Sequence, residues 1–164
     1  MKRLAGPLAL ASAILIADRA SKAWIGKHVS AWDVWPLIPG FVNIIHAENP
    51  GMAFSLFSTA SAAVRSFVLI GLATAVLAVV VGMLWRSVEI VERWALAMVL
   101  GGALGNLWDR IARGTVTDWV DVYYRDWHWA TFNVADSAIS VGALILAVYL
   151  LVPRKSEASA ARVP

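Results

Sequence analysis

Asp118 and Asp136 are the two residues whose type and setting best suit a catalytic pair. Asp118 lies in the strand-like segment 116–119, between bulky apolar neighbours that would limit its hydration. Asp136 opens the last apolar stretch, where a carboxylate can cap the backbone N–H groups of a helix. Two carboxylates that converge in a partly dry site share one proton, so one can act as base on water while the other polarises a peptide carbonyl. This is the chemistry of an aspartic peptidase, although spacing alone leaves the pair as one candidate among several, and capping alone would also explain Asp136.

The remaining acids near the apolar stretches have simpler explanations. Four of them lie in polar connections and are expected to be solvated surface: Asp33, Glu48, Asp121 and Asp126. Asp18 and Lys22 are four residues apart, the spacing of an ion pair on one face of a helix. Asp109 and Arg110 could likewise form a paired anchor at a helix end.

Other catalytic and binding chemistries find little support. The chain has no cysteine, which excludes thiol nucleophiles, disulfides and Cys-based metal sites. The three histidines form no His-Glu-x-x-His pattern, and no serine stands in Gly-x-Ser-x-Gly. A dyad of Ser21 and Lys22 is conceivable, but adjacent residues on a helix point in different directions. These absences lead us to expect no metal and no cofactor. The net charge of +3 comes without a basic stripe interleaved with aromatic residues, so we also expect no nucleic acid.

The composition predicts that these residues are carried by membrane helices. Hydrophobic residues make up 60% and charged residues 15% of the 164 residues, and the mean hydropathy is +0.68. Four apolar stretches come near the roughly 20 residues that cross a bilayer: 4–24, 66–85, 94–110 and 136–153. The first could be a signal peptide, but residues 18–22 make a poor cleavage site. We therefore expect one membrane-embedded domain, 1–164, with a disordered tail at 154–164.

Four crossings would put both termini on one side and would gather the acids on the other. Lysine and arginine divide 7 against 7 between the two sides, which leaves the orientation open. The acids divide 3 against 8, and the side that receives eight also holds both long connections. Residues 41–46 and 116–124 in those connections have the pattern of strands, which predicts a small sheet on the membrane surface. In the third stretch, Gly101 and Gly105 form a Gly-x-x-x-Gly step, typical of close helix packing.

The chain resembles the lipoprotein signal peptidases (signal peptidase II) through five short motifs in the family's order. They are Asp18-Arg19-Ala20-Ser21-Lys22, Asn49-Pro50-Gly51-Met52-Ala53-Phe54, the glycine-rich segment Gly101 to Arg110, Val116-Thr117-Asp118-Trp119, and Phe132-Asn133-Val134-Ala135-Asp136-Ser137. Each motif is short, but five of them joined by four spans make a specific match over nearly the whole chain. Thr117 stands where Val is more usual and Trp119 where Phe is common, and both keep a bulky wall beside Asp118.

The resemblance implies an α-helical integral membrane protein with four transmembrane helices, a small periplasmic β-sheet (β-cradle) and a short outer helix. It implies that Asp118 and Asp136 are the catalytic dyad. Further positions matching the family's supporting or substrate-holding residues are Asp18, Lys22, Asn49, Gly51, Asn106, Asp109, Arg110, Asn133 and Ala135.

The activity implied is that of an aspartic endopeptidase that removes the signal peptide of prolipoproteins on the N-terminal side of a diacylglyceryl-modified cysteine. The implied location is the bacterial inner membrane, with both termini cytoplasmic and the active site at the periplasmic face. Membrane lipid surrounds the protein, and nothing demands more than a monomer. The alternatives are a small proton-coupled transporter, which would require acids deep in several spans, and a non-enzymatic scaffold, which would not explain acids converging from four segments.

Overall fold

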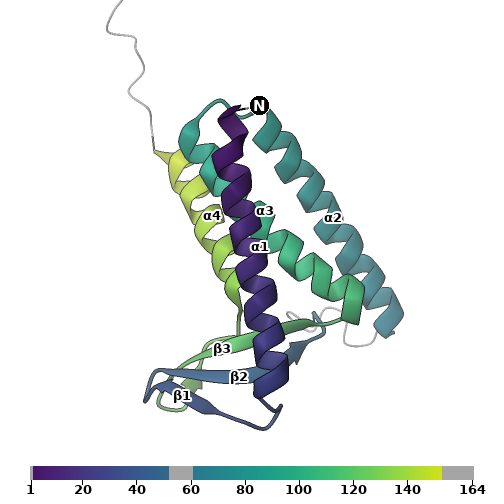
Figure 1. Cartoon of the computed structure of the whole chain (residues 1–164), viewed down its shortest axis with the longest axis vertical. Helices are drawn as coiled ribbons and strands as arrows, with labels where there is room; N and C mark the ends of the chain where they lie inside the picture. The colour runs from purple at the N-terminus through teal and green to yellow at the C-terminus, as the bar shows by residue number, and fades with distance from the viewer. Residues whose placement is uncertain (1, 52–60, 153–164) are drawn as a thin grey trace, which may run out of the picture.

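The computed structural model describes residues 2–51 and 61–152, which form four helices and a four-stranded antiparallel sheet (Figure 1). The helices are α1 (Lys2–His28), α2 (Ala62–Arg86), α3 (Ile90–Arg113) and α4 (Val134–Leu151). All four are long and apolar enough to cross a membrane by length and composition. The four predicted spans are thus present, and α1, α2 and α3 extend past the predicted limits at both ends. No short outer helix occurs among the described residues, and the predicted tail lies outside them.

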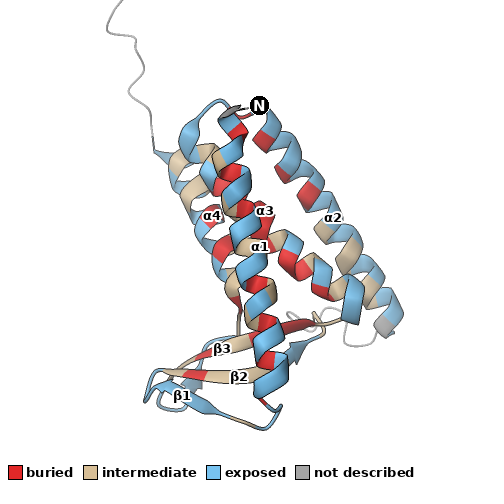
Figure 2. Ribbon diagram, in the orientation of Figure 1, coloured by how far each residue is buried: buried red, intermediate tan, exposed pale blue. Residues whose placement is uncertain are grey.

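Helix α3 is the centre of the bundle. It packs against α1, α2 and α4. Among the described helices and strands, α2 packs along α3 and is otherwise joined to α1 by a hydrogen bond from the Arg3 side chain to the Trp85 carbonyl oxygen (3.3 Å). Half of the α3 span is buried inside the protein, against 17% for each of the other three spans. Apolar side chains of α1, α2 and α3 form the core, including Leu4, Leu77, Leu96 and Leu100. The outward faces of the helices are exposed and apolar, as lipid-facing surfaces are (Figure 2).

Glycines on α3 and α4 allow the helix backbones to approach closely. A Cβ added at Gly101 would lie 2.6 Å from the carbonyl oxygen of Ala11 in α1. One added at Gly142 of α4 would lie 2.7 Å from the carbonyl oxygen of Ala95 in α3. Real Cβ atoms do not approach backbone so closely, so only glycine fits at these crossings. The packing role predicted for Gly101 is confirmed.

The sheet lies at the end of the bundle opposite the N-terminus (Figure 1). Its strands, in the order β1-β2-β3-β4, are Trp35–Ile38, Val42–Asn49, Val116–Tyr124 and Trp127–His128. The strand predicted at 116–124 has those bounds, and the one predicted at 41–46 is longer at its C-terminal end. Gly114, with φ 77°, ends α3 in the left-handed conformation and turns the chain into β3. The chain then returns through β4 and residues 129–133 to the start of α4, which lies beside β3.

Candidate active site

Asp118 is a buried carboxylate in the middle of the sheet, only 1% exposed. It lies on β3 opposite Ala47 of β2. Its Oδ2 accepts a hydrogen bond from Asn49 Nδ2 (2.9 Å), and its Oδ1 accepts one from Asn133 Nδ2 (2.7 Å). Burial raises the pKa of Asp118 to about 6; the nearby charge of Asp136 adds to this effect, while the two amide hydrogen bonds oppose it. Asp118 therefore holds a proton far more readily than an ordinary aspartate.

Asp136 lies in the first turn of α4, held by a reciprocal cap. Asn133 is the N-cap residue: its Oδ1 accepts a hydrogen bond from Asp136 N (3.0 Å), and Asp136 Oδ2 accepts one from Asn133 N (3.2 Å). The capping role considered for Asp136 is therefore real. The cap uses only the Oδ2 atom of Asp136. The other oxygen, Oδ1, accepts a hydrogen bond from Asn106 Nδ2 of α3 at 2.7 Å. Asn133 thus joins both aspartates through one side chain.

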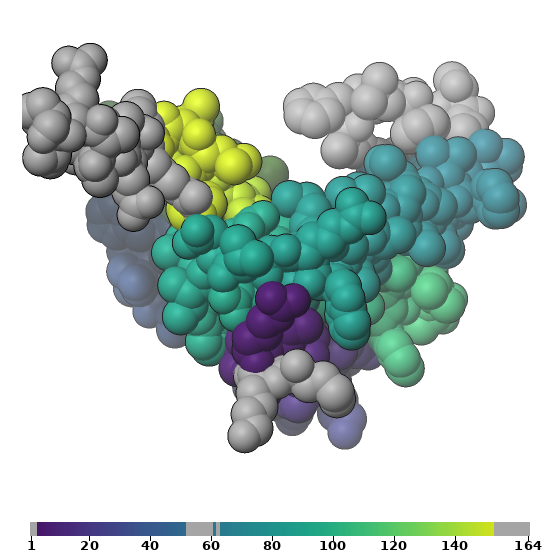
Figure 3. All heavy atoms as spheres, turned by 90° about the horizontal axis from the view of Figure 1, so that it is seen from above, coloured from purple at the N-terminus to yellow at the C-terminus, as the bar shows by residue number. Residues whose placement is uncertain are grey.

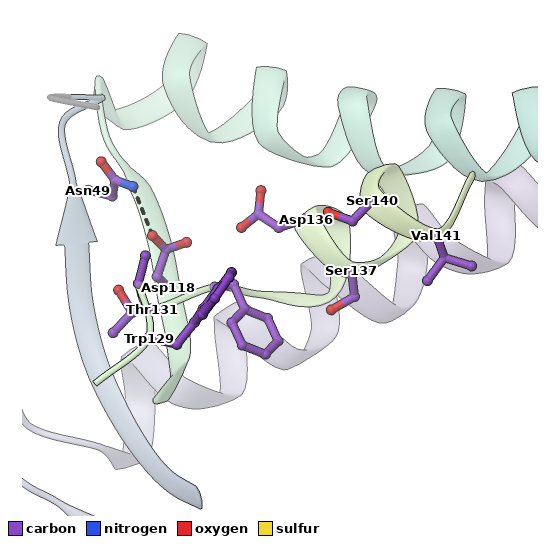
Figure 4. Close-up of a pocket in the computed structure, with 10 residues that line it drawn as sticks. Asn49, Asp118, Trp129, Thr131, Asp136, Ser137, Ser140 and Val141 are labelled. Carbon is purple, nitrogen blue, oxygen red and sulfur yellow. Dashed lines mark hydrogen bonds between the residues drawn. The ribbon is translucent and has the colours of Figure 1, made fainter. Parts of the chain in front are cut away.

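The two carboxylates converge on one pocket of about 600 Å³ (Figure 4). Asp118 reaches it from β3 and Asp136 from α4, with Asn49 beside Asp118. The other walls come from the segment after β4 and from one face of α4: Trp129, Ala130, Thr131, Phe132, Ser137, Ser140 and Val141. The pocket can therefore hold a polar reacting group between two acids, with apolar surface around it.

An apolar groove of about 320 Å³ leads to the same place from the membrane side. Helices α2 and α4 lie apart on the two sides of α3 (Figure 3), and side chains of all three helices line the groove. Leu72 and Val76 of α2 and Ile139 of α4 contribute apolar surface, while Asn106, Arg110 and Asp136 also line it. An apolar segment in this groove would thus be in contact with the Asp136 carboxylate.

Behind the carboxylates lies a buried cluster of charges around Lys22. The Lys22 ammonium, fully buried, contacts Asp18 Oδ2 (2.8 Å), Asp109 Oδ2 (2.9 Å) and Asn106 Oδ1 (2.8 Å). The expected ion pair of Asp18 and Lys22 is confirmed. Asp109 pairs with Lys22, Arg19 and Arg113, not with Arg110 as considered from the sequence. A buried ion is tolerated only when it is paired and hydrogen-bonded, which this cluster provides.

The turn after β2 presents Asn49 to Asp118. Gly51, with φ 79°, donates its N–H to Asn49 Oδ1 (2.8 Å), which leaves the amide NH₂ directed at Asp118. A side chain at Gly51 would be strained in this conformation and would overlap Leu69 of α2. Met52, Ala53 and Phe54, which complete this motif in the sequence, lie outside the described residues.

The structure brings the predicted site residues together in two layers. Around the pocket and groove lie Asp118, Asp136, Asn49, Asn106, Arg110 and Asn133. Behind them lie Asp18, Lys22, Asp109 and Ala135, with Ala135 N donating to Asp18 Oδ1 (3.0 Å). Gly51 holds the turn. The geometry joins all of these residues, and their individual roles remain predictions.

Two features were missed from the sequence. The pocket wall formed by Trp129 and Phe132 depends on the bridge between Phe132 and Val120, which no local pattern reveals. Ser140, in contrast, lies four residues after Asp136, a helical spacing that could have placed it on the same face of α4.

One prediction is corrected. Asp121, expected to be solvated, is 5% exposed; its Oδ2 accepts from Asn43 Nδ2 (2.9 Å) and its Oδ1 contacts His128 Nδ1 (2.8 Å). Partners on two neighbouring strands make its burial possible.

Comparisons with known proteins agree on one family. Residues 10–152 match the family model described as signal peptidase (SPase) II. A lipoprotein signal peptidase of Solibacter usitatus (strain Ellin6076) is 42% identical over 152 residues, covering 92% of this chain and 93% of the relative. One of Yersinia pseudotuberculosis serotype O:1b (strain IP 31758) is 41% identical over 139 residues, covering 84% and 81%.

Solved structures share the fold. A bacterial membrane enzyme determined at 1.9 Å resolution superposes with a TM-score of 0.79 at 24% identity, covering 91% of this chain and 94% of that one. A second, at 2.3 Å resolution, gives a TM-score of 0.79 at 25% identity, covering 89% and 87%.

Proposed function

The chain belongs to the signal peptidase II family of aspartic peptidases, and from this premise we propose that Asp118 and Asp136 are its catalytic dyad. It is a multi-pass membrane protein with lipoprotein signal peptidase function, and prolipoproteins are its substrates. The transport alternative is set aside. The observation that carries the assignment is the convergence of the two carboxylates, from β3 and α4, on one pocket.

The dyad divides the work of peptide hydrolysis between an acid and a base. The raised pKa of Asp118 favours it as the carrier of the shared proton, which leaves Asp136 as the base. Asp136 takes a proton from a water molecule as the water oxygen attacks the scissile carbonyl carbon, and Asp118 donates its proton to the carbonyl oxygen. In the second step the C–N bond breaks, Asp136 passes its proton to the leaving nitrogen, and Asp118 recovers its proton from a hydroxyl of the intermediate.

The substrate is a prolipoprotein whose lipobox cysteine carries diacylglycerol, and cleavage occurs on the N-terminal side of that cysteine. The groove between α2 and α4 supports this choice. It is apolar along Leu72, Val76 and Ile139 and ends at Asp136, so an apolar signal helix lying in it would bring its end to the dyad. A lipid-anchored cysteine presents its scissile bond at this same depth, near the end of the membrane helices.

The protein resides in the bacterial inner membrane as a monomer, with both termini cytoplasmic and the dyad at the periplasmic face. The N-terminus and the end of α4 lie at one end of the bundle, and the sheet with Asp118 lies at the other (Figure 1). A periplasmic active site meets its substrates after their lipid-modified cysteines have crossed the membrane.

Cleavage of a diacylglyceryl-modified prolipoprotein by purified protein in nanodiscs tests the assignment. Asp118→Asn and Asp136→Asn should each abolish turnover while the protein stays folded. Asp126→Asn, an exposed position in the β3–β4 turn, should retain wild-type turnover. Wild-type turnover in either dyad variant would refute the mechanism.

A further inference from the structure

The buried ammonium of Lys22 has more partners than charge compensation requires. Asp18 and Asp109 already supply two carboxylates at 2.8 and 2.9 Å. The third bond goes to a neutral amide, Asn106 Oδ1, at 2.8 Å. The ammonium donates a hydrogen bond to Asn106 in addition to its two ion pairs.

This third bond fixes which way the amide of Asn106 faces. Lysine can only donate, so the atom of Asn106 that faces Lys22 must be the carbonyl oxygen. The NH₂ group is then directed the other way, where Nδ2 lies 2.7 Å from Asp136 Oδ1. A flipped amide would set NH₂ against the ammonium and its oxygen against the carboxylate, which is repulsive on both sides.

A second connection runs from the same ammonium to the backbone of α4. Asp18 Oδ2 contacts Lys22 Nζ, and Asp18 Oδ1 accepts a hydrogen bond from Ala135 N at 3.0 Å. Ala135 directly precedes Asp136. Gly105 of α3 makes room for this carboxylate, since a Cβ there would overlap Asp18.

We propose that Lys22 is a positioning residue for the dyad, orienting the Asp136 carboxylate through Asn106 and holding the first turn of α4 through Asp18. This inference rests on the proposed role of Asp136 as the base. Lys22 is fully buried and lines none of the described cavities, so it acts on turnover without touching substrate.

A double-mutant cycle between Lys22→Met and Asn106→Ala tests the Asn106 connection. Each single variant should lower kcat about 100-fold, the cost expected for a base misplaced by about 1 Å. KM of Lys22→Met should stay within about threefold of wild type, because Lys22 makes no substrate contact. The double variant should be no slower than the slower single variant, since the second change removes a connection already lost. If the double variant instead shows the product of the two losses, or if Lys22→Met retains wild-type kcat, the proposal is overturned.

Lys22→Met leaves buried carboxylates without a partner and could prevent folding, so the cycle is repeated in an Asp18→Asn background. Combining Asp18→Asn with Lys22→Met removes one acid and one cation, so the net charge of the cluster stays that of wild type. The amide oxygen introduced at position 18 can still accept the hydrogen bond from Ala135 N. In this background the kcat of each variant is compared with that of Asp18→Asn alone. A double loss no greater than the larger single loss supports the proposal, and a double loss equal to the product of the two single losses overturns it. Failure of the proposed function would be seen separately: Asp136→Asn would then retain turnover, or the wild-type protein would not cleave diacylglyceryl-modified prolipoprotein.

Discussion

Gly102→Ala should impair catalysis far more than stability. Gly102 of α3 faces the first turn of α4, and a Cβ there would overlap the carbonyl oxygen of Ala135. It would also lie 3.2 Å from the Ala135 carbonyl carbon and 2.9 Å from Ile139 Cγ1. The Ile139 side chain can rotate away, but the backbone cannot, so the first turn of α4 must move by roughly 1 Å to restore normal contact.

That displacement falls on Asp136, the next residue along the chain. A shift of this size separates the carboxylate from Asn106 and from the reacting carbonyl, which should lower kcat about 100-fold. Overpacking costs about 1–3 kcal/mol, and replacing glycine by alanine in a helix returns about 1 kcal/mol. The net loss of stability should therefore be small, and the variant should remain folded.

Two matched glycine variants separate the effect on the site from the effect on packing. Gly142→Ala strains the same α3–α4 interface about two turns farther along α4, against Ala95, and should lower the thermal midpoint while retaining kcat. Gly82→Ala, in α2, meets nothing within 4 Å, so it should retain kcat and raise the thermal midpoint slightly through the helix propensity of alanine. Turnover is measured in nanodiscs at saturating prolipoprotein, with thermal unfolding followed on the same samples. A folded Gly102→Ala with wild-type kcat, or an equal loss of kcat in Gly142→Ala, would refute the reasoning.

Further perturbations test the sheet side of the site. Because the free enzyme needs the proton on Asp118, kcat/KM should fall about tenfold per pH unit above about pH 6. Asn49→Ala removes a hydrogen-bond donor that favours the charged form of Asp118, so the fall in kcat/KM should begin at higher pH. A fall that begins at the same or a lower pH would contradict the assignment. Asp121→Leu leaves two polar partners without their buried acceptor and should lower the free energy of unfolding by about 1–3 kcal/mol in a denaturant titration. Gly51→Ala should lower kcat/KM by displacing Asn49. Gly40→Ala is the control: Gly40 has a similar φ of 86° but open space around it, so this change should only reduce stability. Equal activity of the two variants would argue against a role of the turn at Gly51 in placing Asn49.

The sequence predicted the elements whose signals are local. Strand β3 is rich in β-branched and aromatic residues, and the four helices carry the hydropathy of membrane spans. The first predicted span, 4–24, already ran through Asp18 and Lys22 and stopped only four residues before the end of α1 at His28, where Lys27 and His28 weaken the apolar signal. In the structure Asp18 and Lys22 neutralise each other inside the protein, which allows the helix to carry both charges.

The parts that could not be predicted depend on long-range pairing. The polar neighbourhood of Asp121 predicts a solvated side chain, whereas its burial depends on the β2–β3 register that sets Asn43 opposite it. The link that Asn133 makes between Asp118 and Asp136 likewise requires β3 and the start of α4 to lie together. Resemblance to a family identified these residues, but only coordinates reveal which atoms face one another.

The central place of α3 has a consequence for how the chain is made. Helices α1 and α2 enter the membrane before α3, and in the described residues both pack along α3, while a hydrogen bond from the Arg3 side chain to the Trp85 carbonyl oxygen joins α1 to α2. Until α3 is inserted, Asp18 and Lys22 have neither Asp109 nor Asn106, and their spacing of four residues gives each its only partner. Charges facing lipid are costly even when paired. The arrival of α3 and α4 therefore withdraws these charges from lipid and assembles the dyad in the same step of biogenesis.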